Sequence, residues 1–383
     1  MIFHLLGLPN GKAGWELATN PFNTKILYMI RMLKDLGHEV IHYGVEGSQV
    51  EGAEHVDVVP LSLYNKVYKD RDNSKPDHLG EESGPTWSVY IKSTIRALDQ
   101  RIKTTNKEFI LNFLGYPLRD ITDYFADRAI IVEPGIGHNG SYAPHRIFES
   151  HIWQANTYGK QNPPNQSYFP NLYDAVIPAY FDKKDYPYSA EKDDYFVFLG
   201  RVMWGKGISV AVELTRELGK KLIVIGGGNL DDPKLRLTGD LSHVEHVGAL
   251  TTKQKVKYLS RARALIYFSL YIEPFGHAPI EAQLCGTPVI ASNFGAFTET
   301  VLNGQTGYLA HTFGDLLYAG EHVKDIKPAT CRKWAVDNFD LDRIKLMYDE
   351  YFKKLFGLYN GTDWYGDRPD NLDFMNRYYP NEK

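Results

Sequence analysis

The sequence has few of the features that mark secreted, membrane-spanning or metal-binding proteins. Only two of its 383 residues are cysteines, Cys285 and Cys331, and they lack the CxxC spacing of a zinc or redox site. No apolar run approaches the length of a membrane span. The apolar run at residues 1–6 has no basic leader and ends before Pro9, so we expect no signal peptide and a cytoplasmic protein.

An excess of charge of one sign is also missing. The formal net charge is −4, from 43 basic and 47 acidic side chains, and no Lys/Arg-rich block occurs. We therefore expect no nucleic acid among the partners. Metal ligands are scarce as well. The clearest Asp-x-Asp pair, Asp340 and Asp342, stands at the start of a predicted helix, where acidic residues are favoured as caps, and we interpret it as structural.

Apolar segments that alternate between strand and helix patterns fill the first half of the chain. Asn23 is the expected N-cap of the first helix and Gly37 its end. Residues 46–85 look like an extended insertion or loop with one weak strand at 56–59, and a helix is expected over residues 148–153. The expected strands are residues 2–8, 39–43, 109–113 and 129–133, and the other expected helices are 24–36 and 87–103.

The same alternation starts again after a charged, apolar-poor stretch near residues 180–193. Thr251 and Gln254 form a capping box for a helix that ends near residue 262. Strands are expected at residues 195–199, 221–225, 244–248, 264–268 and 289–291, and helices at 208–218, from about 333, and at 344–358. The fold class is therefore α/β, with two doubly wound, Rossmann-like domains. We place them at residues 1–185 and 186–345, and residues 346–383 form a last helix and tail.

A Gly-rich turn with two cations follows the strand at 195–199. Gly200 and Arg201 end the strand, and Lys206 and Gly207 open the next helix. The spacing imitates a Walker A loop, but Gly207 replaces the Ser or Thr that such a loop needs for Mg²⁺. What remains is a helix N-terminus with an Arg and a Lys, which suits a diphosphate.

Two acids frame the next strand-to-helix connection. Glu273 lies in the loop after the strand at 264–268, where ligands bind in open α/β sheets, and Glu281 lies about two turns into the helix. Gly286, Thr287 and Pro288 then lead into the following strand. Because the acids are separated by a loop and a helix, they need not touch each other.

This region resembles the donor-site signature of retaining glycosyltransferases of the GT-B fold, specifically glycosyltransferase family 4 (glycosyl transferases group 1). The matching pieces are residues 200–207, 273–276, 281–282, 286–291, Glu299 and 303–307. The resemblance covers residues 196–310 closely and the first domain only in layout. It implies two domains facing a cleft, with the last helix crossing back to the first domain, which binds the acceptor.

The resemblance also implies roles for single residues. Arg201 and Lys206 would bind the donor diphosphate and stabilise it as it leaves. Glu273 would contact the donor sugar, and Glu281 would hold the ribose hydroxyls. The backbone amides of Gly276 and His277 would contact phosphate or sugar.

Three further candidates stand in loops. Gly226 begins a Gly-Gly-Gly turn that suits either a tight turn or close approach to a ligand. Gly11 lies in the first loop, where family members carry a Gly pair, but here the glycines are separated. His138 follows the strand at 129–133 and is a candidate contact of the donor sugar.

The resemblance implies a hexosyltransferase that retains the anomeric configuration, and the lack of an Asp-x-Asp motif in a loop predicts that it is metal-independent. It would move a hexose from a nucleotide-sugar donor, such as a UDP- or GDP-hexose, to a hydroxyl acceptor, for example a glycan, without a cofactor. The alternatives are a glycoside hydrolase or phosphorylase, which needs two carboxylates around the sugar bond, and a non-catalytic nucleotide-sugar-binding module. The sequence leaves the base, the sugar, the acceptor, the linkage and the oligomeric state open.

Overall fold

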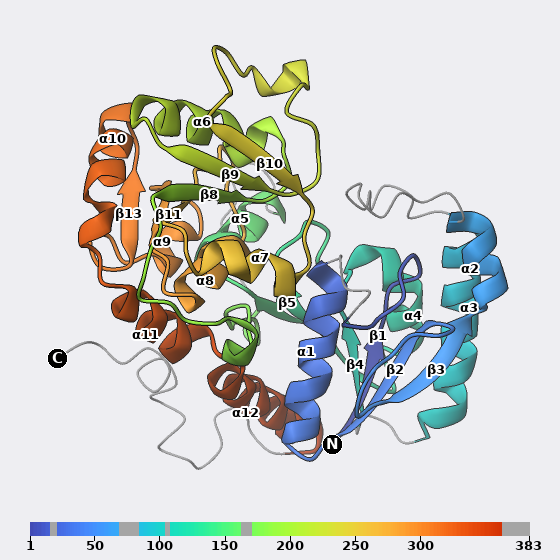
Figure 1. Cartoon of the computed structure of the whole chain (residues 1–383). Coiled ribbons are helices and arrows are strands. Elements are labelled where there is room, and N and C mark those ends of the chain that lie inside the picture. Colours follow the sequence, from blue (N-terminus) through green and yellow to red (C-terminus); the bar gives the residue numbers. More distant parts are fainter. Residues whose placement is uncertain (16–20, 69–83, 104–107, 162–170, 362–383) are drawn as a thin grey trace.

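The computed structural model describes the chain except for residues 16–20, 69–83, 104–107, 162–170 and 362–383. Two parallel sheets lie side by side, each flanked by helices (Figure 1). This is the two-domain α/β architecture expected from the alternating segments. The tail discussed above falls mostly outside the described residues.

The first sheet is built from the first half of the chain. Its strand order in the described residues is β3-β2-β1-β4-β5-β6-β7, with parallel pairing. Its elements are β1 (Ile2–Leu6), α1 (Pro21–Asp35), β2 (Glu39–Val45), β3 (Glu54–Val59), α2 (Leu61–Tyr68), α3 (Pro85–Arg101), β4 (Glu108–Asn112), α4 (Arg119–Tyr124), β5 (Ile130–Ile136), β6 (His145–Phe148), α5 (His151–Gln161) and β7 (Ala175–Val176).

The second sheet has the same winding, with the order β10-β9-β8-β11-β12-β13 in the described residues. The elements of this half are β8 (Tyr195–Leu199), α6 (Ile208–Glu217), β9 (Lys221–Ile225), β10 (Val244–Gly248), α7 (Thr252–Leu259), β11 (Ala264–Tyr267), α8 (His277–Leu284), β12 (Val289–Ser292), α9 (Phe297–Thr300), β13 (Gly307–Ala310), α10 (Phe313–His322), α11 (Pro328–Phe339) and α12 (Leu341–Tyr359). Strands β8 and β11 are neighbours, so the loops that follow them meet at one edge of the sheet.

Three predictions about the first half were wrong. Asn23 does not cap α1, because the helix already begins at Pro21, and the Asn23 side chain donates to the carbonyl of Lys12 instead. In the expected insertion at residues 46–85, the predicted strand is β3, but residues 61–68 form helix α2 instead of irregular structure, and residues 69–83 lie outside the described residues. Phe148 belongs to strand β6, so the helix expected at 148–153 starts only at His151.

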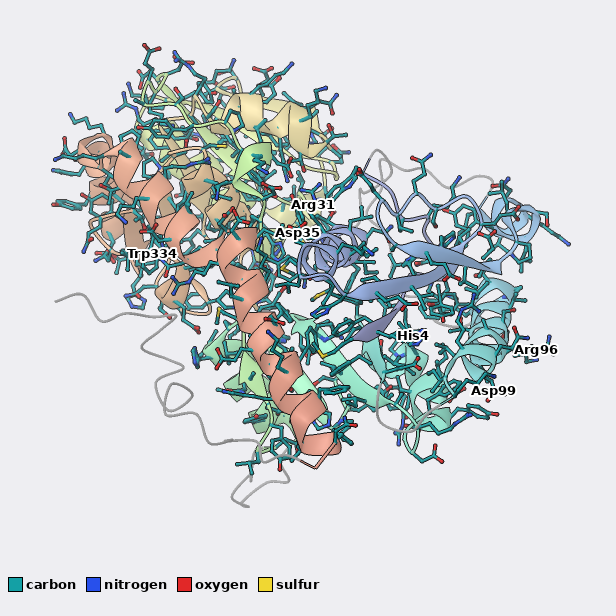
Figure 2. The ribbon with its side chains drawn as sticks, turned by 90° about the horizontal axis from the view of Figure 1, so that it is seen from below. His4, Arg31, Asp35, Arg96, Asp99 and Trp334 are labelled. Atoms are coloured by element: carbon teal, nitrogen blue, oxygen red, sulfur yellow. The ribbon has the colours of Figure 1, made fainter. Side chains whose placement is uncertain are left out.

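Helix α12 packs on the first domain although it follows the second domain in the chain. Its buried face, including Tyr348 and Phe352, shares one apolar core with Phe3 and with Met29 of α1. Figure 2 shows this from below: the last two helices run from the side of Trp334, pass near Asp35 of α1 and continue across the first domain. The chain therefore crosses between the domains twice.

The two segments that cross between the domains, near Phe181 and near Asp340, are hydrogen-bonded to each other. The Phe181 amide donates to the Phe339 carbonyl over 3.0 Å, and the Leu341 amide donates to the Phe181 carbonyl over 2.7 Å. Asp340 accepts from both the backbone amide and the Nζ of Lys183, which agrees with a structural role for the Asp340–Asp342 pair. No side-chain cap of α12 by Asp340 is present, so ion pairing rather than capping explains this acid.

No helix among the described residues is long and apolar enough to cross a membrane.

Candidate active site between the two domains

A cleft of 610 Å³ lies between the ends of the two sheets. Six of the residues predicted from the sequence line it: His138 from the first domain, and Arg201, Lys206, Glu273, Gly276 and His277 from the second. Glu281, Gly200, Gly226 and Gly11 lie outside its lining. The cleft is thus formed where the loops after β5, β8 and β11 converge.

Lys206 and Glu273 form a buried ion pair at the second-domain wall. The Lys206 Nζ lies 2.9 Å from each Glu273 carboxylate oxygen, and both residues are 8% exposed. Burial lowers the pKa of Lys206, Glu273 opposes this shift, and the nearby Arg201 adds to it. An ammonium has three N–H donors, so two bonds to Glu273 leave one for a ligand.

Close backbone contact brings these two side chains together. Gly207 has φ +75°, and a Cβ there would lie 1.8 Å from the carbonyl oxygen of Phe268. Only glycine permits the loop after β8 to touch the loop after β11 in this way. Lys206 itself lies in a single 3₁₀ turn, Trp204–Lys206, just before α6 begins at Ile208. Arg201 is exposed at the same rim.

Close contacts also require glycine at positions 226 and 276. A Cβ on Gly226 would lie 1.8 Å from the Gly200 carbonyl oxygen, so close approach of two protein segments accounts for this glycine. Gly276 has φ +83° and precedes α8, where a Cβ would meet the ring of Phe297 at 2.7 Å. At Gly11 a Cβ would approach the Asn23 side chain at 3.3 Å.

Glu281 occupies a separate, buried position on α8. Because α8 begins at His277, Glu281 lies little more than one turn into the helix. The prediction that it lies about two turns into the helix was therefore wrong. Its Oε1 accepts from the Lys255 Nζ at 2.6 Å and from the Tyr186 hydroxyl at 3.2 Å. Both partners approach the same oxygen of the carboxylate.

His138 presents buried ring nitrogens at the first-domain wall of the cleft. Among the described residues, neither Nδ1 nor Nε2 has a hydrogen-bond partner. Burial, helped by the charge of Lys25, lowers the pKa of His138 to about 4 against the opposing effect of Glu149. A neutral imidazole at this place can both donate to and accept from a hydroxyl group.

Three charged residues of the cleft, Lys25, Glu149 and Lys160, were missed by the sequence analysis. The Glu149 carboxylate lies 2.7 Å from the Lys25 Nζ and 3.6 Å from the Nε2 of His277 across the cleft. Burial alone would raise the pKa of Glu149, but Lys25 and His277 outweigh it and lower the pKa to about 2. Glu149 could have been found from its position directly after strand β6, but the sequence analysis did not predict that strand.

The described parts of the chain contain no group of three or more His, Cys, Asp or Glu side chains arranged to hold a metal ion. The charged groups of the cleft are Lys25, Glu149, Lys160, Arg201, Lys206 and Glu273. Four cations and two carboxylates give this cleft a positive balance, which favours an anionic ligand.

Comparison with known proteins shows that the second domain is similar to glycosyltransferases. Residues 182–316 match the family described as glycosyl transferases group 1. A similar curated relative is D-inositol 3-phosphate glycosyltransferase of Mycobacterium sp. (strain KMS), 28% identical over 157 residues, which are 38% of this chain and 36% of the relative. The chain thus matches only about a third of the length of this relative.

Similar solved structures cover nearly the whole chain. AviGT4, a glycosyltransferase involved in avilamycin A biosynthesis, has a TM-score of 0.65 at 17% identity and covers 94% of this chain and 98% of its own. HepE of Anabaena, in complex with UDP and glucose, has a TM-score of 0.64 at 14% identity, with 92% and 99% covered. At these identities the likeness establishes the GT-B fold.

Proposed function

We propose that this chain, whose residues 182–316 match the glycosyl transferases group 1 family, transfers a hexose from a nucleotide-sugar donor to a hydroxyl acceptor with retention of configuration. The observation that carries the proposal is the Lys206–Glu273 ion pair beside Arg201 at one wall of the cleft. In this proposal Lys206 would bind the diphosphate and Glu273 the donor sugar, and the two side chains lie within one hydrogen bond of each other.

The cations of the second-domain wall would act on the leaving group. As the bond between the anomeric carbon and the diphosphate oxygen breaks, its electron pair goes to that oxygen. Arg201 and the third N–H of Lys206 would stabilise the charge that develops there. Lys206 would have the stronger effect, because it is held in a buried position before the donor arrives, whereas Arg201 is exposed.

Retention would follow from attack on the face that the diphosphate leaves. The acceptor oxygen forms the new bond to the anomeric carbon, and its proton passes to the departing phosphate oxygen. Glu273, with both oxygens on Lys206, is a poor covalent nucleophile, so we assign it to binding and orienting the donor sugar. His138 would accept or donate a hydrogen bond to a sugar hydroxyl from the other wall.

A glycoside hydrolase is a weaker alternative. Such an enzyme needs one carboxylic acid kept protonated as a general acid. The two carboxylates of the cleft are both paired with lysines, Glu273 with Lys206 and Glu149 with Lys25. The strongly lowered pKa of Glu149 makes it unsuitable as a proton donor at neutral pH.

A thermal-shift screen against UDP, GDP, ADP and their hexose conjugates tests the proposal. We expect one nucleotide and its sugar to raise the melting temperature, because a ligand that binds only the folded state stabilises it by mass action. The stabilising donor is then incubated with the protein, and release of nucleoside diphosphate and the anomeric configuration of the product are measured. Absence of both stabilisation and turnover across the set would refute the proposal.

Transfer is also expected to continue in excess EDTA. The proposed leaving-group stabilisation comes from Arg201 and Lys206, so chelation of divalent cations should change kcat less than about twofold. Initial rates with EDTA, with added Mn²⁺ and without either would be compared. Complete loss of turnover in EDTA, recovered with Mn²⁺, would show that a metal ion supplies this charge instead.

A further inference from the structure

The corner between β6 and α5 joins the first domain to the donor-side loop of the second domain. It consists of residues 149–152, and its partners in the second domain are Pro274, His277 and Glu299. These contacts are made by side chains and backbone groups that the transfer reaction sketched above does not use. They raise the question of what holds Glu273 in its working position.

Glu299 caps helix α5 from the opposite domain. Its Oε2 accepts from the His151 amide at 2.9 Å and its Oε1 from the Ile152 amide at 2.8 Å. The His151 ring Nδ1 lies 3.1 Å from the same Oε2. Because α5 is eleven residues long, its first amides favour a carboxylate, and these bonds lower the pKa of Glu299 against the effect of burial.

Ser150 fixes the donor-side loop directly. Its hydroxyl donates to the Pro274 carbonyl at 2.5 Å and accepts from the Trp153 amide at 3.1 Å. The preceding carbonyl, that of Glu273, accepts from the Ala296 amide at 3.1 Å. Two consecutive carbonyls of the loop are therefore held from two sides, one by each domain.

Ala296 connects these two anchors. It immediately precedes α9, and α9 carries Glu299. Gly295, one residue earlier, lies so close to the loop that a Cβ would approach the Glu273 amide nitrogen at 3.0 Å. A movement of the first domain away from Glu299 and Pro274 would therefore be transmitted to the backbone of Glu273 through both paths.

We propose that Ser150 and Glu299 are positioning residues that clamp the Glu273–Pro274 backbone between the domains, so that the Glu273 carboxylate is correctly placed only while the first domain keeps its contacts with Pro274 and Glu299. This inference rests on the proposed transfer reaction for its effect on turnover. The clamp itself is a physical property that can be measured without it.

Hydrogen exchange tests the clamp in the absence of substrate. In Ser150→Ala and Glu299→Gln, amides in peptides covering residues 269–284 and 149–161 should exchange about 3- to 10-fold faster than in the wild type, as expected for loss of one or two hydrogen bonds. Ser150→Thr keeps the hydroxyl and should restore slow exchange. Ser88→Ala and Glu321→Gln, at exposed helical positions, are matched controls and should leave exchange in these peptides unchanged.

Kinetics provide the second measurement. Both clamp variants should lower kcat about 5- to 20-fold, while the affinity for free nucleoside diphosphate and the melting temperature stay near those of the wild type. If both variants show the same hydrogen exchange and the same kcat as the wild type, the proposed clamp is wrong. If the wild type itself transfers no sugar, the proposed function fails, but faster exchange in the two peptides would still support the clamp and unchanged exchange would still overturn it.

Discussion

Replacing Lys206 by methionine is expected to lower kcat about 10²- to 10³-fold with the donor saturating, the size of effect seen when one preorganised donor to a developing oxyanion is removed. Two losses combine in this variant. The leaving diphosphate loses a cation, and the buried Glu273 carboxylate loses the partner that holds both of its oxygens. Arg201→Ala should also act mainly on kcat, because Arg201 lines the same wall.

Steady-state kinetics with the stabilising donor would measure the Lys206 effect. Lys220→Met is the matched control: it removes an exposed ion pair with Asp194, worth at most about 1 kcal/mol, far from the cleft. The melting temperature of Lys206→Met must be recorded, because breaking a buried pair can cost about 3–5 kcal/mol. A folded Lys206→Met protein with an unchanged kcat would remove Lys206 from the proposed mechanism.

The two acids should respond differently in nucleotide binding. Glu281→Ala is expected to weaken binding of the free nucleoside diphosphate by about 1.5–3 kcal/mol, the usual value of a charge-assisted hydrogen bond. Lys255 and Tyr186 both approach Oε1 of Glu281, so in the proposed binding mode Oε2 would receive the ribose hydroxyls. Glu273→Ala should leave nucleotide affinity nearly intact and reduce turnover, since its proposed contact is with the sugar.

Calorimetric titration of the nucleoside diphosphate into both variants would measure this difference. Glu281→Gln serves as a control for shape, because it keeps the size of the side chain but removes the charge that Lys255 neutralises. Equal losses of nucleotide affinity at Glu273 and Glu281 would contradict the assigned division of the donor. If neither variant loses nucleotide affinity, both acids have only a structural role.

Much of the fold was predictable because both domains repeat one local pattern. The strands Lys221–Ile225 and Val244–Gly248 and the capping box at Thr251 and Gln254 occur as predicted, since each has a clear apolar run or capping pair. Strand β6 was missed because His145 and Arg146 give it a polar sequence, although both side chains are buried. Arg146 is compensated by Asp174, which the local sequence could not show.

The candidate site was predictable at the level of loops but not of contacts. The loops after β8 and β11 each carry a recognisable group of residues, and the sheet order makes them neighbours. The Lys206–Glu273 pair depends on the backbone contact at Gly207, which only the three-dimensional structure reveals. Lys25, Lys160 and Glu149 were not predicted because the two lysines lie in helices and Glu149 follows a short strand, each without a motif around it.

The position of α12 sets an order of events during synthesis. Met29 of α1 packs in a core that also needs Tyr348 and Phe352, and these residues are translated after the entire second sheet. Domains generally fold in the order in which they leave the ribosome. Here the first domain emerges early but keeps an open apolar face on α1 until the second domain has been made. The second domain can thus complete its own core first, and the first domain is finished last, when α12 docks.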